Sequence, residues 1–417
     1  MYSNDRRVVV TGLGAITPIG NSPEEFWKGL LAGKSGIDYI RSFDPAELPV
    51  KIAGEVKDLD LDSYLDPKAA RRMARFARFS VAVAKQAMDD SGYVVDENNA
   101  ENVAVVMATG GGGLDVMQDA VESMAARGPR SLGPMVLPGI IANMASCQVS
   151  IAMGTQGPTA TGVAACASGI FSFIDAFHYI KRGEADMAIA GGSDSYITPL
   201  AIASLANMHA LSRNHERPPQ EVSRPFDATR DGFVYSEGAA CAVLETAESA
   251  LARGAKIYAE VVGGAVTADA YHVTAPAPGG AGAARAIERA LKYSGMTPDD
   301  IDYIAAHGTS TPLNDAAETA AIKKALGERA YKVAISSNKS MVGHSLGAAG
   351  AFSAVAVAMS IRDQMVHPTI NYQFPDPECD LDYVPNEARQ MRVRAALANG
   401  FGFGGQNGVV VMREWQP

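Results

Sequence analysis

The order of strand-like and helix-like segments starts again past the middle of this chain, at about Ala259. Residues 8–20, VVVTGLGAITPIG, predict a buried strand followed by a glycine turn, and residues 259–272 repeat that pattern. The strand expected within 102–113 has its counterpart within 301–311. Two halves that alternate strand and helix in the same order predict a duplicated α/β fold with the functional site between the halves.

A turn of small residues followed by an apolar helix occurs once in each half. Thr159–Gly183 has the sequence TATGVAACASGIFSFIDAFHYIKRG, and residues 343–363 follow the same plan. Cys166 is therefore expected where a tight turn enters a buried helix, because the apolar residues after it recur at helical spacing. Peptide N–H groups and the helix dipole would favour a thiolate there. The remaining cysteines are expected to be inert core residues: Cys147, Cys241 and Cys379.

Length and composition restrict the class of protein. A chain of 417 residues exceeds what one hydrophobic core usually organises, so two units are expected, residues 1–258 and 259–417. Four cysteines without metal-type spacing, no cleavable signal and no apolar run of about eighteen residues predict a cytoplasmic protein without a membrane span. The net charge of −10 disfavours nucleic acid as the main partner.

Residues 66–92 are expected to form one long helix whose first turns are basic. Four basic residues recur there at i, i+3, i+4 and i+7 and would lie along one stripe: Lys68, Arg71, Arg72 and Arg75. The stripe is either a solvated helix face or, in so acidic a protein, a docking site for an acidic partner.

Three segments of the second half are rich in reactive groups. They are HGTSTPLND with His307, SSNKSMVGHSLGAAG with Lys339 and His344, and the glycine-phenylalanine loop 400–405. Both histidines close a strand or turn among small residues, whereas the other five histidines are expected to be ordinary core or surface residues. Convergence of these two imidazoles on Cys166 is the most economical interpretation.

Taken together, these segments resemble the β-ketoacyl-[acyl carrier protein] synthases, in particular the elongating condensing enzymes of the synthase II type within the thiolase superfamily. The motifs stand in the family's order: AACASG, RPFDATRDGFVYSEGA, HGTSTPLND, NKSMVGHSLGAAG and GFGFGGQN. The resemblance implies a thiolase-like α/β fold whose two duplicated halves form a five-layer αβαβα sandwich. It also implies decarboxylative condensation of acyl- with malonyl-[acyl carrier protein] to 3-oxoacyl-[acyl carrier protein], in fatty acid or polyketide elongation, without metal or redox cofactor.

The resemblance assigns a role to each matching residue. Cys166 would be the acylated nucleophile, and His307 and His344 the catalytic histidines of the elongating branch. Lys339 would organise the site electrostatically, and Phe403 would gate it and complete an oxyanion hole with the N–H of Cys166. Substrate and pantetheine would bind at Thr309, Thr311, Gly111 and Phe401. The implied partners are a second copy of the chain and acyl carrier protein, which would dock on Lys68, Arg71, Arg72, Arg130 and Thr274.

Two positions depart from the family's pattern. Ser353 stands where a glutamate near the catalytic lysine is usual, which leaves the hydrogen bonds of Lys339 open. Gly111 stands where a bulky aliphatic residue usually closes the acyl pocket. We therefore expect a deeper or more permissive pocket that reaches towards the dimer interface.

Three other functions are less consistent with the sequence. GHSLG (343–347) fits a G-x-S-x-G nucleophile elbow with Ser345, but NKSMV separates it from the preceding strand and His367 follows only twenty-two residues later. A thiolase would need a second cysteine in the loop 400–405, which has none. The non-catalytic partner subunits of polyketide systems lack the nucleophile, whereas Cys166 is present here.

Overall fold

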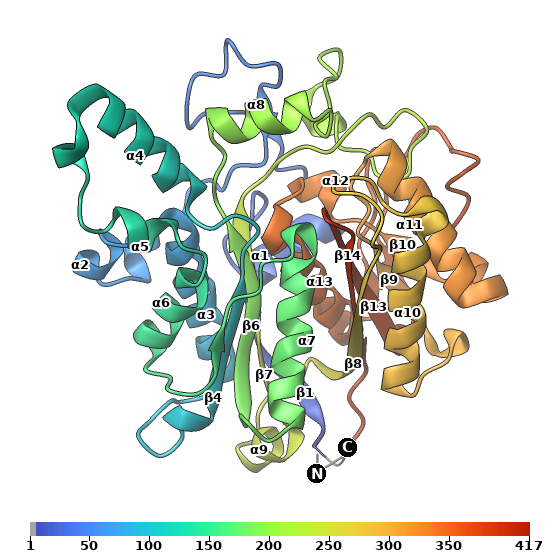
Figure 1. Ribbon diagram of the computed structural model, residues 1–417. Coiled ribbons are helices and arrows are strands. Elements are labelled where there is room, and N and C mark those ends of the chain that lie inside the picture. The colour runs from blue at the N-terminus through green and yellow to red at the C-terminus, as the bar shows by residue number, and fades with distance from the viewer. Residues whose placement is uncertain (1–5) are drawn as a thin grey trace.

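The computed structural model describes residues 6–417 and arranges them in two halves that share one strand order (Figure 1). The first half has the order β5-β4-β6-β7-β1 and the second β10-β9-β13-β14-β8. Numbered by position within its half, each sheet reads 3-2-4-5-1, with parallel pairing in its first two contacts and antiparallel pairing in the rest. The predicted duplication of an α/β unit is confirmed.

The bounds of the strands follow the expected segments. The first half contains β1 (Val8–Ile16), β4 (Val103–Ala108), β5 (Thr159–Ala160), β6 (Met187–Asp194) and β7 (Gly238–Thr246). The second contains β8 (Ala259–Ala268), β9 (Tyr303–Ala305), β10 (Ala334–Ser336), β13 (Ala395–Gly402) and β14 (Gln406–Arg413). Four short strands form two separate pairs: β2 (Asp38–Tyr39) with β3 (Ile52–Ala53), and β11 (Met365–Val366) with β12 (Arg389–Gln390).

Helices form three layers, one between the two halves and one on the outer face of each. Two of them, α7 (Ser168–Lys181) and α13 (Ala349–Asp363), lie between the halves and pack on strands of both. The outer face of the first half is covered by α3 (Arg75–Ser91) and α6 (Met144–Met153), and that of the second by α10 (Ala281–Ser294) with α11 (Pro312–Leu326) against it. Because β1 and β8 pair at Val8–Val10, hydrogen bonding continues from one half into the other. The five-layer sandwich is confirmed.

The remaining helices surround this framework. They are α1 (Pro23–Leu31), α2 (Pro67–Ala70), α4 (Leu114–Arg127), α5 (Val136–Ile140), α8 (Pro199–Asn207), α9 (Ala247–Ala252) and α12 (Lys339–Val342). Ser22 caps α1 and Pro23 occupies its first turn, a common start for a helix.

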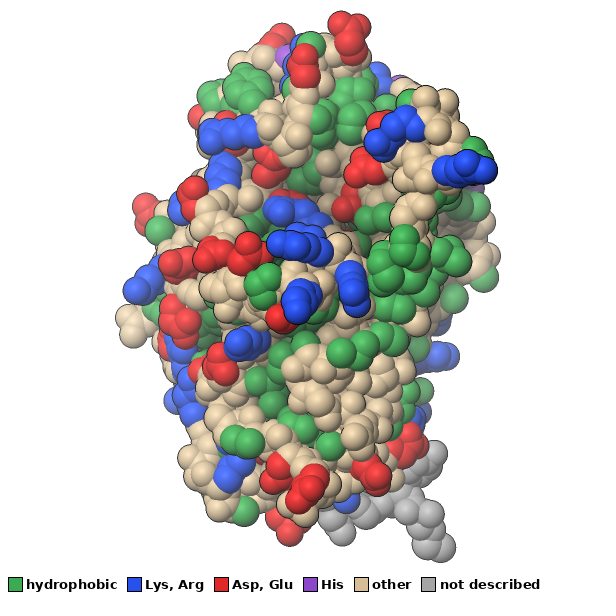
Figure 2. Space-filling view, turned by 90° about the vertical axis from the view of Figure 1, so that its left-hand side faces the viewer, with side chains coloured by type: hydrophobic (Ala, Val, Ile, Leu, Met, Phe, Trp, Pro, Cys, Tyr) green, Lys and Arg blue, Asp and Glu red, His purple; other side chains and the backbone are tan. Residues whose placement is uncertain are grey.

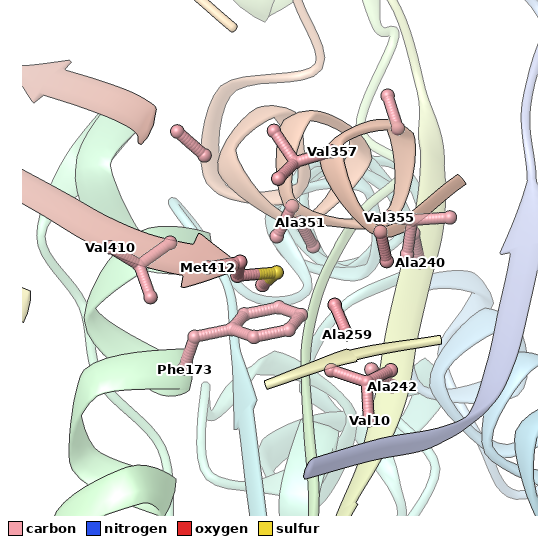
Figure 3. Close-up of a cluster of buried hydrophobic side chains, with 14 of the residues drawn as sticks. Val10, Phe173, Ala240, Ala242, Ala259, Ala351, Val355, Val357, Val410 and Met412 are labelled. Atoms are coloured by element: carbon pink, nitrogen blue, oxygen red, sulfur yellow. The ribbon is translucent and has the colours of Figure 1, made fainter. Parts of the chain in front are cut away.

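The largest core lies where the two central helices meet the strands of both halves (Figure 3). Phe173 of α7 and Val355 of α13 are buried there beside Val10, Ala240 and Val410. The segment Leu346–Asp363 has the length and composition of a membrane span, yet 89% of it is buried inside the fold. We therefore interpret it as a core helix.

The glycine turn expected after the first strand is wrong. Gly12 and Gly14 lie inside β1, where α3 crosses the strand at very short range. A Cβ on Gly12 would come within 2.1 Å of the Ala87 carbonyl oxygen, and one on Gly14 within 2.0 Å of the Val83 carbonyl oxygen. These glycines therefore permit close packing of a helix on a strand and do not turn the chain.

The single helix expected over residues 66–92 is also wrong. The chain forms α2, leaves helical geometry, and enters α3 only after Ala74, whose backbone is extended at φ −64° and ψ 158°. The spacing argument for one basic stripe therefore fails, and Arg75 instead pairs with Glu237 at 2.8 Å. Lys68, Arg71 and Arg72 remain exposed on α2 and just after it.

Candidate active site

Cys166 lies in a single 3₁₀ turn, Ala165–Ala167, that leads directly into α7. Ala165 has φ 47°, a left-handed conformation that residues with side chains seldom adopt. Ser168 stabilises the turn, since its hydroxyl accepts from the N–H of Ala164 and donates to the carbonyl of Ala165. The expected position at the entry to a buried helix is confirmed.

A cavity of about 330 Å³ brings together residues that lie far apart in the sequence. Cys166 from the first half and both His307 and His344 from the second contribute to its lining. Five further predicted residues line the same cavity: Phe401, Phe403, Thr309, Thr311 and Thr274. Lys339 lies behind this lining and is only 1% exposed. The convergence of the cysteine and two histidines is thus realised.

The two histidines reach the cavity from different loops. His307 follows β9, and its N–H donates to the carboxylate of Glu318 at 2.8 Å. His344 follows α12, and its N–H donates to the carbonyl of Val234 at 2.7 Å. Burial lowers the pKa of both imidazoles well below the usual value, and the nearby positive charge of Lys339 lowers them further. Both rings are therefore neutral at pH 7 and can donate an N–H.

Lys339 is a buried cation held among carboxylates. Burial lowers its pKa to about 8, while the negative charges of Glu318 and Asp315 raise it. Ser353, which stands where the glutamate is usual, is buried in α13. Among the charges that raise the pKa of Lys339, that of Glu318 acts most strongly.

Glu318 was not anticipated from the sequence. Besides the N–H of His307, its carboxylate accepts from the N–H of Gly308 at 2.7 Å and from the amide of Asn399 at 3.0 Å. A signal was present, because Asp315 and Glu318 stand three apart in an alanine-rich helix and so face the same side. Both carboxylates are buried against the loop that carries His307.

The thiolate expected at Cys166 is wrong for the resting site. Burial raises the pKa of its thiol to about 12, although the N–H groups of Phe403 and Cys166 itself and the charge of Lys339 all act to lower it. Desolvation of a side chain that is only 4% exposed outweighs these three effects. The two N–H groups directed at the sulfur are nevertheless placed as donors for an oxyanion that forms beside it.

Comparisons with known proteins agree with this geometry. A family model described as "Beta-ketoacyl synthase, N-terminal domain" matches residues 5–250, and one described as "Beta-ketoacyl synthase, C-terminal domain" matches residues 258–373. The chain belongs to the β-ketoacyl synthase family. It is accordingly a condensing enzyme of the acyltransferase class.

Individual members of the β-ketoacyl synthase family match the whole chain. The chain is 51% identical over 412 residues to the 3-oxoacyl-[acyl-carrier-protein] synthase 2 of Synechocystis, covering 99% of both chains. It is 45% identical over 414 residues to the protein of that name from Staphylococcus aureus strain COL, covering 99% of this chain and all of the relative.

Solved ketosynthases share the fold throughout. The ishigamide ketosynthase/chain length factor matches with a TM-score of 0.92 and 36% identity over 99% of this chain and all of that one. A type II PKS acyl-carrier protein in complex with its ketosynthase bound to a hexaketide matches with a TM-score of 0.92 and 35% identity, with the same coverage.

Two threonines of this β-ketoacyl synthase that are predicted to bind pantetheine, Thr309 and Thr311, line the cavity from the loop after His307. The hydroxyls of Thr309 and Thr311 are 2.9 Å apart, and the N–H of Thr309 donates to the carboxylate of Asp315 at 3.0 Å. Thr274 lines the same cavity from a loop whose Val273 carbonyl accepts the N–H of Gly404 at 2.6 Å. Thr274 thus lies beside the loop of Phe403, in the cavity lining, to which none of the four basic docking candidates contributes.

The open space expected at Gly111 is not present. A Cβ on Gly111 would come within 2.8 Å of the Tyr196 ring and 2.9 Å of the Leu114 side chain. Tyr196 therefore fills the space that the missing aliphatic side chain would leave, and Gly111 lies outside the lining of the cavity at Cys166. The prediction of a deeper pocket at this position is wrong for the chain taken by itself.

α2 and α4 lie on the side of the molecule that faces the viewer in Figure 2, and Lys and Arg side chains gather near the middle of that face. Lys68, Arg71 and Arg72 are exposed on α2 and just after it. Arg130 is exposed in the 3₁₀ turn Pro129–Ser131 that follows α4. None of these four side chains contributes to the cavity that holds Cys166.

Proposed function

We propose that Cys166 of this β-ketoacyl synthase carries an acyl chain as a thioester and condenses it with malonyl-[acyl carrier protein]. The products are 3-oxoacyl-[acyl carrier protein], CO2 and free carrier protein, in fatty acid or polyketide elongation. One observation carries the assignment: a cysteine flanked by two N–H donors shares a cavity with two neutral imidazoles, those of His307 and His344.

In the first half-reaction the sulfur of Cys166 attacks the thioester carbonyl of acyl-[acyl carrier protein]. The thiol is neutral at rest, so its proton leaves as the carbon–sulfur bond forms and passes to the departing pantetheine thiol. The N–H groups of Cys166 and Phe403 donate to the tetrahedral oxyanion. Lys339 stabilises negative charge on the sulfur.

In the second half-reaction the malonyl thioester enters the same cavity and loses CO2. The electron pair of the broken carbon–carbon bond passes into an enolate. The enolate oxygen accepts hydrogen bonds from the imidazole N–H groups of His307 and His344. The enolate carbon then attacks the acyl carbonyl on Cys166, forming the new carbon–carbon bond. The sulfur departs as a thiolate and takes up one proton from solvent, the proton that the overall reaction consumes, which restores the resting thiol.

Acyl carrier protein is the proposed donor of both substrates. A solved ketosynthase of 35% identity is seen in complex with such a carrier protein, which supports the assignment. We place its docking site at Lys68, Arg71 and Arg72, with Arg130 as a further candidate, because these cations are exposed on an otherwise acidic protein. Thr274 lines the cavity, so we assign it to the pantetheine arm.

A homodimer is the proposed assembly. The 14-residue helix α4 has no buried residue in the single chain. Its apolar side chains Met117, Val121 and Met124 are each more than 40% exposed. Leu137 and Ile151 are exposed in the adjoining helices, and Figure 2 presents hydrophobic side chains across this face. A helix with such a surface is expected to be covered by a second copy.

Two further assignments complete the proposal. We divide the chain into residues 1–258 and 259–417, because β8 begins at Ala259 and family models match on either side of that point. We also propose a cytoplasmic location, which the four unpaired cysteines support.

Mass spectrometry of the acylated protein tests the function. Incubation with acyl-[acyl carrier protein] is expected to add one acyl mass to the peptide that contains Cys166, and malonyl-[acyl carrier protein] is then expected to remove it with release of CO2. Cys166→Ala abolishes both steps, whereas Cys241→Ala, at a buried cysteine in β7, retains them. Acylation elsewhere in the chain, or product formation by Cys166→Ala, would overturn the assignment.

A further inference from the structure

The turn that carries Cys166 has a structural twin in the second half. Leu346–Ala348 forms a 3₁₀ turn that leads into α13, as Ala165–Ala167 leads into α7. The first residue of each turn has the same unusual backbone, with φ 47° at Ala165 and φ 46° at Leu346. Gly347 therefore occupies the position equivalent to Cys166, and its N–H is the counterpart of an N–H that faces the reacting carbonyl.

The carboxylate of Asp194 occupies this second position. Its Oδ2 accepts from the N–H of Gly347 at 2.6 Å and from the N–H of Gly110 at 2.9 Å. Its Oδ1 accepts from the hydroxyl of Thr109 at 2.5 Å. Asp194 is the last residue of β6 and is 0% exposed. A carboxylate of the first half thus fills the site where the second half would bind an oxyanion.

The same contact fixes the segment that bears a catalytic histidine. Gly347 lies three residues after His344, and a Cβ on Gly347 would come within 2.2 Å of the Gly110 nitrogen. On the other side, a Cβ on Gly169, at the start of α7, would come within 2.9 Å of the Gly347 carbonyl oxygen. The backbone between His344 and the helix of Cys166 is therefore close-packed, and Asp194 supplies its hydrogen-bonded anchor.

We propose that Asp194 is a positioning residue for condensation: its carboxylate fills the unused oxyanion position at Gly347 and thereby holds His344 in register with Cys166. This proposal rests on the roles assigned above to these two residues. Asp194 has a second effect on the same site, because its negative charge raises the pKa of the Cys166 thiol. Loss of the carboxylate is expected to loosen His344 and to make the thiol more reactive.

These two effects have opposite signs and can be separated from a general structural role. The titratable groups that interact with Asp194 are Cys166, Tyr196 and Tyr235, and burial raises the pKa of each. The pKa of Asp194 itself is raised by burial to about 7. Because the raised pKa of Tyr196 and Tyr235 keeps both tyrosines neutral, a change in the reactivity of Cys166 on removal of the Asp194 charge reports on that carboxylate.

The test uses the full-length protein with Asp194→Asn, and Thr109→Val as a second variant that removes one donor to the same carboxylate. Three rates are measured: acylation of Cys166, CO2 release from malonyl-[acyl carrier protein] by the acylated protein, and alkylation of Cys166 by iodoacetamide from pH 6 to 10. For Asp194→Asn we expect acylation within a few-fold of the wild-type rate, condensation lowered by about 100-fold, and an alkylation profile moved to lower pH. Thr109→Val is expected to show the same division between steps in milder form, and Thr109→Ser to restore condensation.

Equal losses of acylation and condensation, with an unmoved alkylation profile, would overturn the proposal and leave Asp194 a purely structural residue. Where Asp194→Asn does not fold, the same comparison on Thr109→Val decides. Failure of the wild-type protein to acylate at Cys166 would instead contradict the proposed function, so the two failures are distinguishable.

Discussion

The imidazole rings of His307 and His344 lie almost perpendicular, at 82°, with their centroids 5.3 Å apart. Each ring also contacts a phenylalanine edge to face, His307 with Phe401 at 5.7 Å and His344 with Phe233 at 5.0 Å between centroids. Two rings fixed in this way can direct their N–H groups to one point, which a single enolate oxygen requires. Both rings are buried, with His307 3% and His344 1% exposed, so each donor acts in a site of low dielectric.

The division of labour between cysteine and histidines is directly testable. In His344→Ala the acyl thioester on Cys166 is expected to form at a rate close to that of the wild type, because the oxyanion donors there are backbone groups. Release of CO2 is expected to fall by ~100-fold to ~1000-fold, the usual effect of losing one such donor. Single-turnover assays measure both steps, with the exposed His215→Ala as control. A comparable loss in the acylation step would contradict this division.

Lys339 is expected to set the acid limit of condensation. Burial is the largest cause that lowers the pKa of His307 and His344, and the charge of Lys339 is the second largest. Lys339→Met removes that charge, so the histidines take up protons at higher pH and lose the neutral state that the enolate step needs. The acid limb of the kcat profile should therefore move to higher pH. The exposed Lys332→Met is the control, and an acid limb that stays in place or moves to lower pH would show that Lys339 has another role.

Much of this site could be predicted from the sequence because the duplication repeats local patterns. The turn at Cys166 and its helix are set by small residues and helical spacing, and the loop of His307 follows a short apolar strand. Such signals are local in the chain, so periodicity and turn residues disclose them. The strand order of one half then constrains that of the other.

The features that sequence reasoning missed depend on contacts across the fold. Gly12 suggests a turn by its residue type, but its requirement comes from the backbone of α3, seventy-five residues away at Ala87. Tyr196 fills the space at Gly111, and Asp194 reaches Gly347 in the other half. The thiol of Cys166 stays protonated because burial outweighs the N–H groups and the lysine charge that lower its pKa. Burial is a property of the whole structure and is not encoded in a local motif.

Docking of the carrier protein should depend on charge at α2. The double variant Arg71→Glu, Arg72→Glu is expected to raise KM for carrier-bound substrates at least about tenfold, since it replaces attraction by repulsion at a surface contact. Reaction with small acyl thioesters should change little. The matched control is Arg289→Glu, Lys292→Glu on α10, which changes the net charge equally at exposed residues elsewhere. Equal effects on both kinds of substrate would remove α2 from the docking site.

Asp227 should contribute stability that disappears in acid. Burial alone would raise the pKa of this carboxyl, but hydrogen bonds from Thr229, Phe374 and Gln373 lower it to about 2. It also pairs with Arg224, and both side chains are 0% exposed. An aspartate whose folded pKa lies below its unfolded value stabilises the protein above the unfolded pKa of about 4, and this stabilisation is lost as the pH falls towards 2.

Asp227→Asn removes the titrating group but keeps its shape. At pH 7 the free energy of unfolding is expected to fall by about 2 kcal/mol, the value of a shift of nearly two pKa units. Urea unfolding between pH 7 and pH 3 should show the variant and the wild type converging as the pH falls, because the wild type then protonates Asp227. Asp299→Asn, at an exposed aspartate, is the matched control and should follow the wild type throughout. A difference in stability that is the same at every pH would show that Asp227 acts through its shape and not through its charge.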